Sequence, residues 1–354
     1  MRIKRIGREY QHPEDLVFTE TRGALRAQYI LKNIHNVNMS VKWDGNPTIY
    51  FGRDSSGRFT LVGKNGWGHE WIGSVDELIS WTMSRGKQEG WRSRFAEDLA
   101  KLWRIIESNF PETETGFYYA DVLWHPGKSY EVDGKHLHFA PNKTTYSIDQ
   151  DSDLANTIIK SSVGLAIHKH YRDFHKNAYG YPPQENLFKN SNSIVVMSQT
   201  AVKGKISLDS EKLKALDELL DEKHYLPLDQ FLSEHRPGLS DFREIIYKYT
   251  NSMVKAHSVD LISVENFRDW LRQSSVSFNK QGKIEALLKQ NSAQMSLMFD
   301  IYHQVMDIKD DLIRQLDENN VTFKSTVNGR PGSEGYVTTR FYIKLVPRRQ
   351  WVPD

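Results

Sequence analysis

Residues 40–47 read Ser-Val-Lys-Trp-Asp-Gly-Asn-Pro, which places a lysine, a carboxylate and a glycine within four positions. A lysine amine acts as a nucleophile only where desolvation, another cation or a metal favours its neutral form. A loop between strands can supply such surroundings. The same tetrapeptide is also typical of a tight turn in which Asp44 bonds its own backbone and Gly45 takes a positive φ. Its meaning therefore depends on the rest of the chain.

The composition describes a chain of balanced charge. With 354 residues it can form one large domain or two ordinary ones. Charged residues make up 26% and the net charge is +2, so any contact with nucleic acid must be local rather than a bulk polybasic effect. The absence of cysteine excludes disulfides, thiolate zinc sites and cysteine nucleophiles. No apolar run approaches membrane-spanning length, so we expect a soluble, cytoplasmic protein without membrane contact.

The hydrophobic pattern divides the chain into three parts. Residues 1–207 are irregular up to residue 16 and then mix strand patterns with helices at 19–33, 75–85 and 92–109. Residues 208–319 show helical periods throughout, and strand patterns resume in 320–354. We therefore expect an α+β domain whose sheet is completed by the last segment, with the all-helical module 208–319 inserted between its strands. Expected strands are 39–41, 47–51, 59–62, 116–124, 136–149 as a hairpin, 163–171, 193–198, 321–323, 335–339 and 341–346.

Several stretches resemble, in order, the motifs of one superfamily. Lys42-Trp43-Asp44-Gly45 resembles the first motif of the covalent nucleotidyltransferases, the ATP-dependent polynucleotide ligases and mRNA capping enzymes, whose lysine becomes linked to a nucleoside monophosphate. A set of such stretches in the family's order is much less often a coincidence than a match to one short motif. The later stretches are Gly63–Gly66 with Lys64, Tyr118–Leu123 with Asp121, Glu334–Val337, and Phe341–Lys344.

This resemblance implies a nucleotidyltransferase domain of ATP-grasp-like antiparallel sheets, with Lys42 as the nucleophile. It implies ATP as the nucleotide, with Mg²⁺ or Mn²⁺ held by Asp121 and Glu334, because magnesium prefers oxygen ligands. Cationic side chains are needed beside the attacked phosphorus, since its oxygens are negative. An aromatic side chain should stack on the base; Tyr146 and the segment 165–168 compete for this role, and Tyr146 is favoured. The residues implied in nucleotide binding are Asp44, Gly45, Lys64, Tyr146, Glu334 and Lys344.

The chain departs from the family pattern at several positions. Asp121 stands where the family usually has glutamate, and Tyr342 where it usually has a lysine. The arginine expected shortly after the first motif is missing from Asn46-Pro47-Thr48, and only ten residues follow Lys344, so we expect no appended oligonucleotide-binding barrel. The last two features favour phage-type RNA ligases, in which helices replace the barrel. Those enzymes append the helices after the fifth motif, whereas here the helical module precedes the fourth.

The expected activity is an ATP-dependent polynucleotide ligase, with RNA favoured as substrate. Lys42 would form lysyl-AMP, pass AMP to a 5′-phosphate end, and a 3′-hydroxyl would then seal the strand. A capping-type nucleotidyltransferase and a non-catalytic nucleic-acid-binding protein on the same fold are the alternatives. The helical module could serve RNA docking, a protein partner or dimerisation.

Two pairs of histidines offer a different chemistry. His136-x-His138 and His168-x-His170 are each spaced to share one face of a strand, which could suit a metal such as zinc. No HExxH pattern accompanies them and cysteine is absent. Solvated or supporting histidines are therefore the favoured interpretation.

Overall fold

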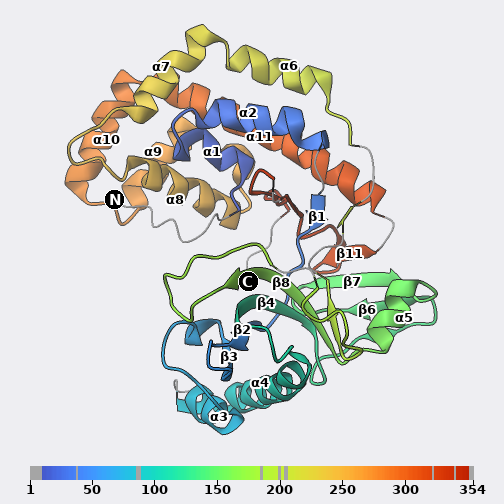
Figure 1. The fold of residues 1–354 in the computed structure, drawn as a ribbon. Coiled ribbons are helices and arrows are strands. Elements are labelled where there is room, and N and C mark those ends of the chain that lie inside the picture. Colours follow the sequence, from blue (N-terminus) through green and yellow to red (C-terminus); the bar gives the residue numbers. More distant parts are fainter. Residues whose placement is uncertain are drawn as a thin grey trace.

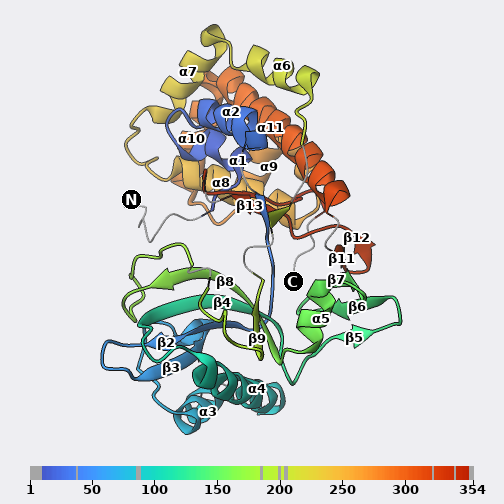
Figure 2. The same ribbon diagram turned by 45° about the vertical axis from the view of Figure 1, so that its right-hand side comes forward.

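The computed structural model describes residues 10–36, 39–84, 89–183, 186–197, 201–202, 206–320, 323–338 and 340–350. These residues form eleven α-helices and three sheets, which confirms the mixed α+β class. Figures 1 and 2 show two lobes, one built mainly of helices and one mainly of strands. None of the described helices has a stretch long and apolar enough to span a lipid bilayer.

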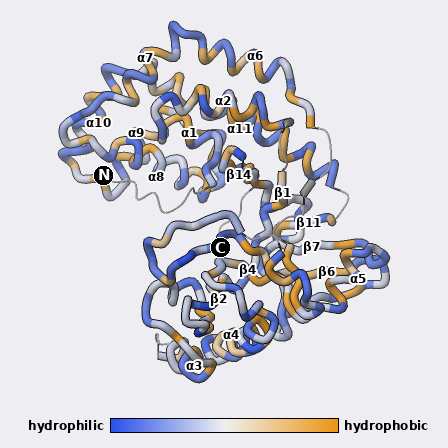
Figure 3. Tube along the Cα trace, in the orientation of Figure 1, coloured by the Kyte–Doolittle hydropathy of each residue, from blue (hydrophilic) through white to orange (hydrophobic). Residues whose placement is uncertain are grey.

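The helical lobe is organised around α11 (Ser292–Asn319), which is buried along most of its length. Apolar and polar stretches follow one another along its helices (Figure 3), as expected for amphipathic helices, in which apolar residues recur every three to four positions. The other helices of the predicted module are α6 (Ser210–Leu219), α7 (Glu222–Ser233), α8 (Phe242–Lys255), α9 (Val264–Gln273) and α10 (Phe278–Gln290).

Two N-terminal helices belong to this lobe as well. The expectation of irregular chain to residue 16 is wrong, because the structure has α1 (Pro13–Thr19) there. The helix expected over 19–33 is present over a shorter range as α2 (Gly23–Asn33), and both helices are packed on α11. The break lies at Arg22, which takes a positive φ of 55°. Gly23 approaches α1 so closely that a Cβ there would lie 1.7 Å from the Leu16 carbonyl oxygen.

The largest sheet has the strand order β3-β2-β4-β8-β9. Helices α3 (Val75–Ser84) and α4 (Glu89–Asn109) cover the face turned away from the helical lobe (Figure 1), where Ile49, Phe51 and Tyr118 are buried. Side chains of alternate residues point to the other face. That face carries the opposed pair Thr48 and Asp121. The strands are β2 (Thr48–Arg53), β3 (Phe59–Gly63), β4 (Gly116–Trp124), β8 (Val163–Tyr171) and β9 (Ile194–Val196).

A second sheet has the order β12-β11-β7-β6-β5, with α5 (Asp153–Ile159) packed on β7. Its strands come from segments before and after the helical module in the sequence, since β7 precedes the module and pairs with β11, which follows it. The predicted hairpin over 136–149 is present as β6 and β7. The strands are β5 (Glu131–Val132), β6 (His136–Phe139), β7 (Thr144–Asp149), β11 (Lys324–Val327) and β12 (Arg330–Pro331). Residues 321–322, in an expected strand, lie outside the described residues.

The third sheet is small and lies at the junction of the two lobes (Figure 2). Its order is β10-β1-β13-β14. Strand β13 pairs with β1, although the whole helical module lies between them in the sequence. The strands are β1 (Met39–Val41), β10 (Ala201–Val202), β13 (Tyr336–Thr338) and β14 (Ile343–Leu345). Thr339, the end of one expected strand, and Ser198, the end of another, lie outside the described residues.

A buried ionic cluster joins α1, α11 and the C-terminal segment. Lys309 Nζ lies 2.6 Å from Glu14 Oε1, and both side chains are fully buried. Arg348 donates two hydrogen bonds of 2.7 Å to the Asp15 carboxylate and one of 3.2 Å to the Tyr302 hydroxyl. Burial acts to raise the pKa of Glu14, but the charges of Lys309 and Arg348 bring it below its usual value. The carboxylate is therefore retained as an anion inside the protein.

We expect Lys309→Met to lower the free energy of unfolding by about 3 to 5 kcal/mol, because it leaves the Glu14 charge buried without its closest partner. Urea denaturation followed by circular dichroism measures the change. The double variant Glu14→Gln, Lys309→Met removes both charges and should recover most of the loss. A single variant as stable as the wild type would show that the pair does not hold α1 on α11.

Candidate functional site

Lys42 follows β1 directly and is held against the loop before β13. Its backbone N–H donates a hydrogen bond of 2.9 Å to the Gly335 carbonyl oxygen. Gly335 has a φ of 100°, and a Cβ at this position would lie 1.9 Å from the Leu345 carbonyl oxygen. Only glycine tolerates both conditions. The loop therefore brings Glu334 beside Lys42.

The Lys42 ammonium lies between two carboxylates. Its Nζ is 3.6 Å from Asp44 Oδ1 and 3.6 Å from Glu334 Oε2, and the side chain is about one quarter exposed, at 27%. Burial raises the pKa of Asp44, and the negative charges of Glu334 and Asp121 raise it further, while Lys42 opposes them. Two carboxylates therefore contact Lys42 and a third, Asp121, acts on Asp44, which leaves the group with an excess of negative charge that a cation could balance.

Residues at the start of β7 hold these carboxylates in place. The Asn142 side-chain amide donates to Asp44 Oδ2, and the Thr144 hydroxyl donates to Glu334 Oε1. The Asp44 backbone N–H donates to the Tyr146 hydroxyl at 3.2 Å. The sequence analysis did not single out Asn142 or Thr144. Their position just before and within the first residues of a predicted hairpin strand was the only available signal.

Gly45 allows the loop to lie directly on β4. A Cβ at Gly45 would lie 2.4 Å from the Val122 carbonyl oxygen and 3.0 Å from Asp121 Cβ. The Asn46 N–H donates to the Val122 carbonyl oxygen, and the Val122 N–H donates to the Pro47 carbonyl oxygen, each at 2.9 Å. This close approach brings Asp121 near Asp44, on whose carboxyl its charge acts.

Asp121 is held by two neighbours on its sheet. The Thr48 hydroxyl donates to Oδ1 at 2.7 Å, and His168 Nε2 lies 2.9 Å from Oδ2. Asp121 is buried, with 7% of the residue exposed. His168 lies in the segment 165–168 that was the less favoured of the two predicted base-binding segments.

The histidines of β8 do not share a face. A β-bulge between Tyr119 and Ala120 shifts the register of β4 against β8. His168 consequently lies beside Asp121, whereas the His170 ring stacks on Tyr118 with centroids 4.8 Å apart. Tyr118 points into the core under α3 and α4. A zinc site made of both histidines is therefore excluded by the bulge.

The Tyr146 ring does not fit its predicted role as a base-stacking aromatic. It is 1% exposed and packs against Trp43 at 4.8 Å, Phe139 at 5.1 Å and Phe323 at 5.7 Å between ring centroids. A ring enclosed in this way has no free face for a base. Burial raises its pKa well above the usual value, so the hydroxyl that meets Asp44 stays protonated. Tyr146 supports the site from within the core.

Other aromatic rings are partly exposed on the Asp121 face of the largest sheet. The Tyr50 and Tyr119 rings stack with centroids 5.0 Å apart, and Trp67 stacks on Tyr50 at 4.4 Å. The Tyr119 ring also lies 5.3 Å from the His168 ring. The sequence analysis did not select Tyr50 or Tyr119, because strand aromatics are common in cores.

The two further predicted lysines lie on different strands around the group. Lys64 is exposed and follows β3, whose last residue Gly63 is opposite Ile49, next to Thr48. Lys344 on β14 is opposite Val337 on β13, and Val337 is in turn opposite Ser40 on β1. Lys344 therefore lies in the row of the sheet that contains Ser40, two positions before Lys42.

His12, whose side chain is 11% exposed, feels the charges of Lys42 and Lys344 and was not predicted as a site residue. Burial lowers its pKa well below the usual value, and the charges of Arg348, Lys344, Lys309 and Lys42 lower it further. The ring is therefore neutral. Its Nδ1 atom has no hydrogen-bond partner within the described part of the chain.

A pocket of about 720 Å³ opens beside Asp44 and Glu334. This volume is in the range of small-molecule sites. Lys143 and Arg330 bring positive charge to its wall, and His257 comes from the helical lobe. The remaining lining belongs to the β11–β12 hairpin and to the C-terminal segment 346–350.

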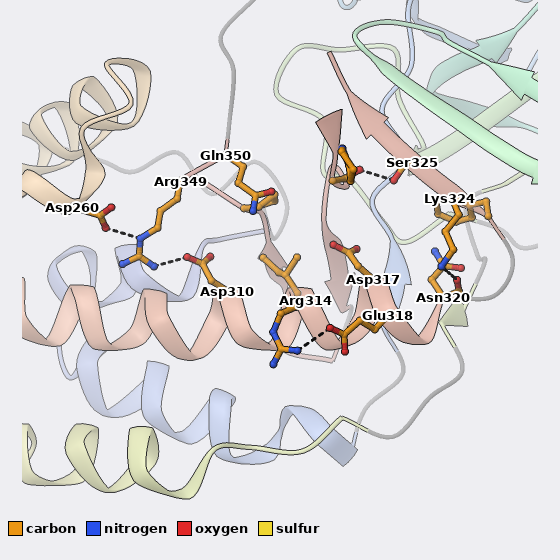
Figure 4. A pocket seen from close by; sticks show the side chains of 15 residues that line it. Asp260, Asp310, Arg314, Asp317, Glu318, Asn320, Lys324, Ser325, Arg349 and Gln350 are labelled. Atoms are coloured by element: carbon orange, nitrogen blue, oxygen red, sulfur yellow. Dashed lines mark hydrogen bonds and ion pairs between the residues drawn. The ribbon is translucent and has the colours of Figure 1, made fainter. Parts of the chain in front are cut away.

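A second pocket of about 680 Å³ lies on the other side of that C-terminal segment, between α11 and β11 (Figure 4). Its charged groups are largely paired with one another. Arg349 contacts Asp260 at 2.6 Å and Asp310 at 2.5 Å, and Arg314 contacts Glu318 at 2.9 Å. The pocket beside Asp44 is therefore the better candidate for a charged ligand.

Comparison with known proteins gives one family. A model of a family of unknown function, DUF6267, matches residues 9–352. The chain belongs to this family. No curated protein and no solved structure matches it. The match covers Lys42, Asp121 and Glu334 together with the helical module, so the family comprises the whole two-lobed arrangement and not the sheet lobe alone.

We expect Gly45→Ala to lower the free energy of unfolding by about 1 to 3 kcal/mol, because its methyl group would overlap the Val122 carbonyl. Gly282→Ala is the matched control, since a Cβ in that position of α10 meets no atom within 4 Å, and it should be neutral or stabilising by about 0.5 to 1 kcal/mol. Thermal unfolding measures both. Equal effects at the two positions would contradict the close packing of the loop on β4.

Proposed function

We propose that the protein is an ATP-dependent polynucleotide ligase, with RNA as the favoured substrate, that works through lysyl-AMP on Lys42. The observation that supports this most strongly is the contact of the Lys42 ammonium with Asp44 and with the distant Glu334, together with Asp121, whose charge acts on Asp44. If Lys42 were only a solvated lysine in a turn, the chain would not need Gly45 and Gly335, neither of which leaves room for a Cβ, to bring these groups together.

In the first step the Lys42 amine attacks the α-phosphorus of ATP. A nitrogen–phosphorus bond forms, the bond from the α-phosphorus to its bridging oxygen breaks, and pyrophosphate leaves while the amine loses its proton. In the second step an oxygen of a 5′-phosphate end attacks the same phosphorus, the nitrogen–phosphorus bond breaks, and Lys42 regains a proton. A 3′-hydroxyl then attacks the activated end, forms the phosphodiester and releases AMP. Dividing one difficult displacement in this way is the usual benefit of covalent catalysis.

The surrounding residues suit these steps by charge. Lys344, in the row of the small sheet that contains Ser40, and Lys64, directly after β3, would supply positive charge to phosphate oxygens. The pocket beside Asp44 would take the nucleotide, with Lys143 and Arg330 on its wall. Asp44, Asp121 and Glu334 are oxygen donors with excess negative charge, which suits Mg²⁺ or Mn²⁺. When bound, such an ion supplies charge neutralisation on the phosphates.

The Lys42 partners also have a role of their own. Glu334 and Asp44 position the Lys42 side chain between them, each with an oxygen 3.6 Å from Nζ. A cation drawn to the same carboxylates would compete with Lys42 for their oxygens and free the side chain to approach the nucleotide. Nucleotide binding and release of the nucleophile from the carboxylates would thus be coupled.

The adenylation test uses the purified protein with magnesium and ATP labelled at the α-phosphate, with labelled GTP in parallel, followed by denaturing electrophoresis. We expect label from ATP that survives denaturation and is lost in Lys42→Ala. Lys214→Ala, an exposed lysine of α6, is the control and should keep the label. Label from GTP alone would favour a capping-type enzyme. No label with either nucleotide, from folded protein that mass spectrometry shows not to be adenylated already, would favour a non-catalytic nucleic-acid-binding protein.

We expect Glu334→Gln to reduce the rate of labelling about 100-fold, because it removes one of the two charges that hold Lys42 and would attract the metal. The isosteric change keeps an oxygen for the Thr144 hydroxyl, so folding should be preserved. Glu265→Gln, at an exposed residue in the first turn of α9, is the control. Equal labelling rates in Glu334→Gln and in the control would remove Glu334 from the site.

A further inference from the structure

The outer face of the β5–β6 hairpin gathers nitrogen and oxygen donors far from Lys42 in the sequence. Asp133 lies in the turn, and His136 and His138 lie on β6. One donor atom from each of the three residues lies within 4.8 Å of the other two. The intervening Leu137 is buried in the core, so the two histidines share the solvent face of the strand.

The two oxygens of the Asp133 carboxylate contact different groups. Oδ1 accepts the backbone N–H groups of Lys135 at 2.8 Å and of His136 at 2.7 Å, which fixes the turn. Oδ2 is directed at the histidines, 3.0 Å from His138 Nε2 and 3.9 Å from His136 Nδ1.

Ser147 orients the His138 ring from behind. Its hydroxyl on β7 lies 2.7 Å from Nδ1, and β6 and β7 pair His138 directly with Ser147. Metal-binding histidines commonly use the second ring nitrogen for such a hydrogen bond, which sets the tautomer and the orientation of the ring. When Nδ1 donates to Ser147, the lone pair of Nε2 points toward Asp133.

We propose that Asp133, His136 and His138 form a binding site for a divalent transition metal ion of the zinc class. Two imidazoles and one carboxylate are typical zinc ligands and are poor ones for magnesium or calcium. The separations of 3.0 and 3.9 Å lie on either side of the distance of about 3.3 Å between ligands of a tetrahedral site with bonds of 2.0 to 2.1 Å.

The same face offers further donors to complete the coordination. Glu131 on β5 is opposite His138, and Asp149 on β7 is opposite His136. Both of these acidic residues are exposed. Side chains opposed in this way lie about 4.5 to 5.5 Å apart at their Cβ atoms. Either carboxylate or a water molecule can take the fourth position. The ion would cross-link the turn at Asp133 to β6. The same sheet contains β7, from which the Thr144 hydroxyl donates a hydrogen bond to Glu334.

The test is calorimetric titration of zinc sulfate into the full chain after treatment with a chelator and its removal. We expect one ion per chain and loss of this binding in the double variant His136→Ala, His138→Ala. Asp133→Asn keeps an oxygen for the two turn N–H groups and removes the charged ligand, so it should weaken binding at least about tenfold. Ser147→Ala should weaken it about tenfold. His235→Ala, an exposed histidine in the helical lobe, should bind as the wild type does.

The alternative is a hydrogen-bonded network without metal, in which Ser147 donates to Nδ1 and Nε2–H donates to Asp133. Absence of saturable zinc binding by the wild type would support that network and overturn the proposal. Unchanged binding in folded Asp133→Asn and in the double variant would overturn it as well. Lys42→Ala should bind zinc like the wild type, so failure of the ligase proposal leaves this result unaffected.

Discussion

The contact of Lys42 with Asp44 and Glu334 joins the three sheets of the protein at one point. Glu334 reaches Lys42 because β13 pairs with β1 and because Gly335 fits against Leu345. Asp44 reaches it because Gly45 lies on the Val122 carbonyl. The second sheet contributes through the Thr144 hydroxyl, which binds Glu334. All three sheets therefore meet at one lysine, and a change in the position of any of them would alter its charged surroundings.

The helical lobe contributes to the same region through charges rather than through a direct hydrogen bond to Lys42. Lys309 of α11 pairs with Glu14 of α1, and Arg348 of the C-terminal segment pairs with Asp15. His12 precedes these acids and lies near Lys42 and Lys344 as a neutral ring. Because buried charges tolerate little displacement without a large loss of stability, this cluster fixes the lobe that carries α1 and α11 relative to the small sheet.

Particular residues show why some elements could be predicted and others could not. Pro13 followed by two acids is a typical helix start, yet these acids are buried against basic residues that follow much later in the sequence. No local pattern identifies such partners. Tyr146 and His168 were both candidates for the base, and a strand pattern does not say which strand lies next to Asp121. The pairing of β8 with β4 and the bulge between them placed His168 there, while β7 turned Tyr146 into the core.

By itself, the sequence determined the alternation of strand-rich and helical segments, because hydrophobic periodicity is a local property of the chain. The requirement for glycine at positions 45 and 335 was decided by the tertiary structure, because a Cβ there would meet the carbonyl oxygens of Val122 and Leu345. Only the tertiary structure decided that α1 and α2 join the helical lobe and that Asn142 and Thr144 hold the carboxylates. It likewise decided that the two histidines of β8 are separated while His136 and His138 face Asp133 together. These outcomes depend on strand register and on burial of charge, which arise from contacts between residues far apart in the chain.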